Sequence, residues 1–70
     1  MNAAEALEAG RALGIKGTEI FAGAMAIHTV HIRDGLTPPG IDELHTLAYE
    51  DLAARRQQAG QVALEGQITL

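Results

Sequence analysis

The sequence predicts an all-α protein in which three short helices pack as a small helical bundle. Three observations support this fold class. Apolar residues recur at intervals of three and four positions, the chain is rich in alanine, and glycine or proline signals divide it into three helical segments. Seventy residues are enough for one domain only. We therefore expect a single helical domain over residues 1–60, followed by an extended C-terminal tail over 61–70.

The first helix is predicted at about residues 2–13. Asn2 is a residue type that favours the N-cap position, and Gly14 can end the helix in a tight turn. Alanine and leucine residues recur along one side of the segment, and charged residues occupy the other side. The predicted inner stripe consists of Ala3, Ala6, Leu7, Gly10 and Leu13.

The second helix is predicted at about residues 18–34, with Thr18 as its N-cap and Gly35 in the left-handed position that follows a helix. This helix is apolar on nearly every side through its first three turns. A helix with that pattern has to be buried on two faces. The rest of the chain is too short to cover both, so we expect part of the cover to come from another copy of the chain or from a partner protein.

The third helix is predicted at about residues 38–59. Thr37 as N-cap and Pro38 at the first helical position are a recognised start signal, and Gly60 is expected to end the helix. Its inner face is predicted to consist of Ile41, Leu44, Ala48 and Leu52. The tail after Gly60 contains β-prone residues. The sequence leaves open whether that tail pairs with itself, pairs with a partner or is solvated.

Composition excludes several classes of function. The chain has no cysteine, five basic residues against nine acidic ones, and a net charge of −4. A nucleic-acid-binding surface needs a basic face, so binding to nucleic acid is disfavoured. The longest apolar run, residues 20–27, is far shorter than a membrane span. The first residues do not resemble a secretory signal, and we expect a cytoplasmic protein.

The sequence predicts neither a catalytic site nor a metal-binding site. The chain contains no serine, and no nucleophile, base and acid can be assembled from it, so we expect a protein without enzymatic activity or a cofactor. His28 and His31 are three positions apart, and His45 follows on the next helix. Their spacing lacks the glutamate of the zinc-protease helix motif, and half-packed rings at the end of a buried helix are the simpler interpretation. No metal site is predicted.

The second helix therefore provides the main functional hypothesis. Its apolar residues predict an interface with a second copy of the chain, most simply in a symmetric dimer, and with another protein. We expect a small adaptor, inhibitor or assembly factor, of the kind that bacterial and phage genomes encode as accessory proteins. The predicted interface consists of Phe21, Ala22, Met25, Ala26, His28 and Ile32.

Two alternative functions remain open from the sequence. In the first, an oligomer binds a small anionic or nucleotide-like ligand at a subunit seam, with His28, His31, Arg33 and Thr37 as contacts. In the second, the first two helices form a helix-turn-helix-like DNA-binding unit around Gly14. The second alternative is weakened because no Arg, Lys, Asn or Gln precedes Arg33 on the second helix.

Overall fold

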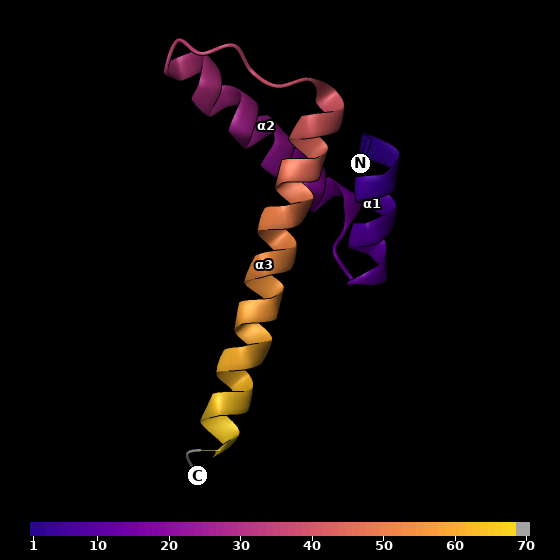
Figure 1. Ribbon diagram of the computed structural model, residues 1–70, viewed down its shortest axis with the longest axis vertical. Coiled ribbons are helices and arrows are strands. Elements are labelled where there is room, and N and C mark those ends of the chain that lie inside the picture. Colours follow the sequence, from indigo (N-terminus) through magenta and orange to yellow (C-terminus); the bar gives the residue numbers. More distant parts are fainter. Residues whose placement is uncertain (69–70) are drawn as a thin grey trace.

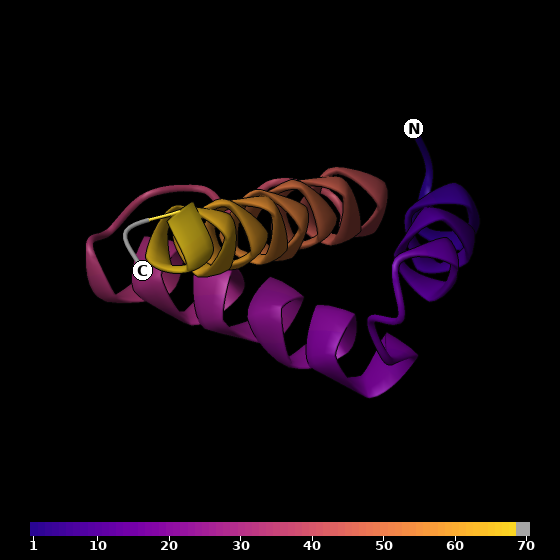
Figure 2. The same ribbon diagram turned by 90° about the horizontal axis from the view of Figure 1, so that it is seen from below.

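The fold consists of three helices in the computed structural model, which describes the backbone of residues 1–68 and the side chains of residues 1–60 (Figure 1). They are α1 (Ala3–Ala12), α2 (Gly17–Arg33) and α3 (Ile41–Ile68). The described residues contain no strand, so the predicted all-α class is confirmed. Helix α2 crosses α3, and α1 lies beside the first half of α3 and the start of α2 (Figures 1 and 2).

A capping box fixes the start of α1. The Asn2 side chain accepts a hydrogen bond from the Glu5 backbone N–H at 2.8 Å, and the Glu5 carboxylate accepts one from the Asn2 N–H at 2.9 Å. Two further bonds join this end to α3. The Ala3 N–H donates to Asp42, and the Thr46 hydroxyl donates to the Met1 carbonyl, both at 2.9 Å. The predicted N-cap at Asn2 is confirmed.

The turn between α1 and α2 depends on Gly14, which has a φ of 76° as its predicted turn role requires. The Arg56 guanidinium of α3 donates to the Gly14 carbonyl at 3.1 Å and so ties the turn to the third helix. The prediction that Thr18 caps α2 is wrong. Ile15 is buried in the core, and the next residue, Lys16, takes the N-cap position. Its carbonyl accepts the first hydrogen bonds of the helix, so Thr18 lies inside the first turn.

The core lies where the three helices meet. Ile20 and Ala24 of α2 are fully buried against Leu44 and Ala48 of α3, and Ile15 closes one end. Helices α2 and α3 approach closely because Gly23 faces Ala48, and a Cβ built on Gly23 would lie 3.2 Å from the Ala48 Cβ. His45 is buried too, and its Nδ1 lies 2.8 Å from the Ile41 carbonyl one turn earlier, at hydrogen-bond distance.

Helix α3 starts later than predicted. Residues 36–40 form an irregular segment and the helix begins at Ile41, so the predicted start at Thr37 and Pro38 is wrong. The reason is the second proline. The ring of Pro39 disfavours helical backbone at Pro38, which therefore cannot open the helix. The Leu44 N–H donates to the Gly40 carbonyl at 2.9 Å, and Ile41, predicted to be inside, is 64% exposed.

Helix α3 also ends later than predicted. It continues without interruption through residue 68. The predicted helix end at Gly60 is therefore wrong, and so is the extended conformation predicted for residues 61–68. The predicted tail also includes residues 69–70, which lie outside the described residues. Gly60 does not adopt a positive φ, and nothing lies within 4 Å of the position of a Cβ there. A helix satisfies its backbone hydrogen bonds within the segment itself, whereas an extended tail leaves them to water or to a strand partner. Figure 1 shows this second half of α3 extending past α1 and α2.

None of the described helices is both long enough and apolar enough to cross a membrane.

The crossing of α2 and α3 gives a first testable prediction. Gly23→Gln should lower the free energy of unfolding by about 1–3 kcal/mol, because the added side chain forces the two helices apart at Ala48. The matched control is Gly60→Gln, where the space around the helix is open. That change should be neutral or stabilising, since glycine is the poorer helix former. Urea unfolding followed by circular dichroism measures both, and equal effects would contradict the close crossing.

Candidate interaction surface

Helix α2 has one buried side and two exposed apolar flanks. Ile20 and Ala24 face the core, and Ile27 packs partly against it. The first flank, here called the Phe21 face, consists of Phe21, Met25, His28 and Ile32. Of its side chains, Phe21 is 54% exposed, Met25 37% and Ile32 57%, while His28 is half-buried. All four residues were among those predicted from the sequence for an interface.

The fold covers only part of the Phe21 face. The Phe21 ring lies 6.3 Å from the buried His45 ring, centroid to centroid, with 47° between the ring planes. Beside this contact the Phe21 side chain keeps more than half of its surface in solvent. The described fold thus buries α2 on one side only.

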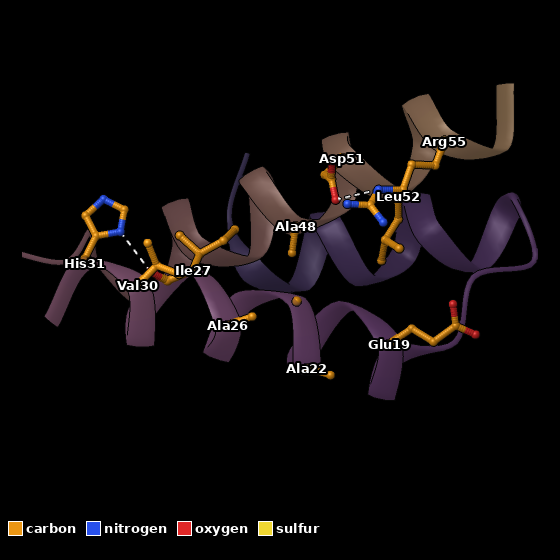
Figure 3. Close-up of a pocket in the computed structure, with 11 residues that line it drawn as sticks. Glu19, Ala22, Ala26, Ile27, Val30, His31, Ala48, Asp51, Leu52 and Arg55 are labelled. Carbon is orange, nitrogen blue, oxygen red and sulfur yellow. Dashed lines mark hydrogen bonds and ion pairs between the residues drawn. The ribbon is translucent and has the colours of Figure 1, made fainter. Parts of the chain in front are cut away.

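The second flank of α2 forms one wall of a groove against α3 (Figure 3). The groove has a volume of about 580 Å³. Small residues line its α2 side, and Ile27, Val30 and Leu52 supply larger apolar side chains. The polar groups lie mainly toward its ends. The full lining is Glu19, Ala22, Gly23, Ala26, Ile27, Val30, His31, Ala48, Asp51, Leu52 and Arg55.

The groove divides the predicted interface in two. Ala22 and Ala26 line the groove, whereas Phe21, Met25, His28 and Ile32 belong to the opposite flank. Sequence reasoning missed Val30 and Leu52 as parts of this surface. Val30 follows Ala26 by four positions and could have been found from that spacing. Leu52 could not, because its place in the groove depends on the angle at which α3 crosses α2.

Polar side chains, some of them charged, mark the ends of the groove. Near one end, Glu19 of α2 lies across from an ion pair on α3 in which the Arg55 Nε and an Asp51 oxygen are 3.1 Å apart (Figure 3). At the other end is His31, whose Nδ1 lies 2.8 Å from the Ile27 carbonyl, at hydrogen-bond distance. Glu19 forms no ion pair among the described residues.

The four residues considered as ligand contacts are placed differently from one another. His31 lines the groove, His28 lies on the Phe21 face, and Thr37 is exposed in the segment before α3. The Arg33 Nε lies 3.4 Å from the Asp34 carboxylate next to it in sequence, with both side chains exposed. Within the part of the chain that the structure describes, no cluster of three or more His, Asp or Glu side chains could hold a metal ion.

Comparison of the chain with protein-family models, with curated proteins and with solved structures produced no match in any of the three.

A second prediction concerns the Phe21 face. Ile32→Gln should change the free energy of unfolding by no more than about 0.5 kcal/mol, because the Ile32 side chain is mostly in solvent and glutamine is a good helix former. The control is Ile20→Ala in the core, where a loss of about 2–5 kcal/mol is expected. Both variants are compared by urea unfolding at a single protein concentration. A loss at Ile32 as large as that at Ile20 would mean that this face supports the fold.

Proposed function

We propose that this protein is a small non-enzymatic interaction module that self-associates through α2 and binds another protein as an adaptor, inhibitor or assembly factor. One observation carries the proposal. The central helix of the domain leaves apolar side chains exposed on both of its flanks. Apolar side chains exposed side by side on one helix are typical of contact sites.

A chain of 70 residues with this many exposed apolar side chains gains stability when a second chain covers them. Large apolar side chains are exposed on all three helices and on the segments next to them; they are Met1, Leu7, Leu13, Phe21, Met25, Val30, Ile32, Leu36, Ile41 and Leu47. Removing apolar surface from water is worth about 25 cal/mol per Å². A domain of this size has a small core, so burial against a second chain would add substantially to its stability.

The proposed mechanism is contact rather than chemistry. The Phe21 face offers an aromatic ring, a flexible methionine and a branched aliphatic side chain on one rigid helix. These residue types fill pockets on a partner well, and methionine adapts to irregular surfaces. Such a face would act by occupying a complementary apolar surface on a larger protein.

The experiment that tests the proposal is the oligomeric state of the pure protein. Sedimentation equilibrium at micromolar concentration should give a mass above the 7.4 kDa of one chain, and most simply twice that mass. The midpoint of thermal unfolding should also rise with protein concentration, since association stabilises the folded chain. A mass of one chain together with a midpoint independent of concentration would overturn the proposed self-association.

A further inference from the structure

We infer that the groove between α2 and α3 receives α2 of a second copy of this chain, in an antiparallel pair around a two-fold axis beside Ala26. The inference rests on the self-association proposed above and assigns it to one of the two flanks. It also fixes which residues meet across the axis. The observations that carry it are the shape of the groove and the positions of the charges on α2.

The shape of the groove suits a close helix pair. Ala22, Gly23 and Ala26 have little or no side chain on the α2 wall of the groove, so a second helix can approach at the short end of the usual 8–10 Å range between helix axes. Ile27, Val30 and Leu52 would then pack against its sides. With the axis beside Ala26, the two copies of Ala26 meet each other. Ala22 and Val30 are each four positions from Ala26, so a small residue of one copy faces a larger one of the other.

The charges on α2 select the antiparallel direction. Glu19 and Arg33 lie seven positions before and after Ala26, and the helical period places all three on one side of α2. The two-fold axis therefore brings Glu19 of each copy opposite Arg33 of the other. A parallel pair would place Glu19 against Glu19 and Arg33 against Arg33, which is unfavourable.

Both charged side chains are available for this pairing. Glu19 has no ion-pair partner among the described residues, and Arg33 is 3.4 Å from Asp34 with its side chain 72% exposed. An exposed contact of that length contributes little. Asp51, near the Glu19 end of the groove, already has Arg55 as an ion-pair partner on its own helix.

The opposite flank does not specify an orientation in this way. Phe21, Met25, His28 and Ile32 include no carboxylate, lysine or arginine, so that face has no charge pattern that distinguishes one direction of a second copy from the other. With the groove occupied by the second copy, the Phe21 face stays free for a different protein.

Charge reversal tests the inference on the full chain. Glu19→Arg alone and Arg33→Glu alone should each weaken self-association on the order of tenfold, because the two symmetry-related pairs change from attraction to repulsion. An equimolar mixture of the two variants should associate again as a heterodimer, since every pair is then of opposite charge. Sedimentation equilibrium measures all three samples. Matched controls with the same change of charge, Glu8→Arg and Arg11→Glu on the exposed side of α1, should associate as the unaltered protein does.

Cross-linking gives an independent readout, because the chain has no cysteine of its own. Ala26→Cys should form a disulfide-linked dimer under mild oxidation, since the two copies of position 26 meet at the axis. Met25→Cys, on the opposite flank, should remain largely uncross-linked under the same conditions.

The outcomes distinguish the two proposals. If the unaltered protein associates but the charge variants behave like their controls and position 26 does not cross-link, the groove is not the interface and self-association stands. If the unaltered protein is monomeric at every concentration tested, the proposed self-association and this inference both fail. Restored association in the mixture, together with cross-linking at position 26, would support the antiparallel pair.

Discussion

The close crossing of α2 over α3 is the contact on which the other features of this structure depend. Gly23 provides the space for Ala48, and the two helices approach until Ile20 and Ala24 are fully buried against Leu44. This close approach buries the side of α2 that carries Ile20 and Ala24 in the core. The flanks on either side of the crossing are then left uncovered, one as the Phe21 face and the other as the wall of the groove. Both candidate surfaces follow from this one contact.

The length of α3 limits how much of α2 can be covered. The helix has 28 residues, and its second half extends past the other two helices (Figure 1). All the described residues from Ala54 to Gly60 are exposed. A chain of 70 residues that uses so many of them in an extended helix has few left to pack around α2. The exposed flanks are thus a consequence of how the chain is distributed among its three helices.

Three helix boundaries differ from those that the sequence predicts, and each difference has a local physical reason. Thr37 and Pro38 resemble a helix start, but Pro39 prevents Pro38 from adopting helical backbone and moves the start to Ile41. Gly60 resembles a helix end, yet a single exposed glycine costs a helix only about 1 kcal/mol, and α3 continues through it. Thr18 is a good capping residue, but the buried Ile15 sets the start of α2 two residues earlier, with Lys16 in the capping position.

The sequence by itself determined the all-α class, the number of helices, the turns at Gly14 and Gly35, and an apolar α2 with Phe21, Met25, His28 and Ile32 on one stripe. These features depend on local backbone preferences and on helical period, which a sequence displays directly. Only the tertiary structure decided that Ala22 and Ala26 belong to a groove with Leu52, that Ile41 is exposed, and that Arg56 reaches Gly14. Those features depend on the angle and depth at which α2 crosses α3, which is set by contacts between residues far apart in the chain.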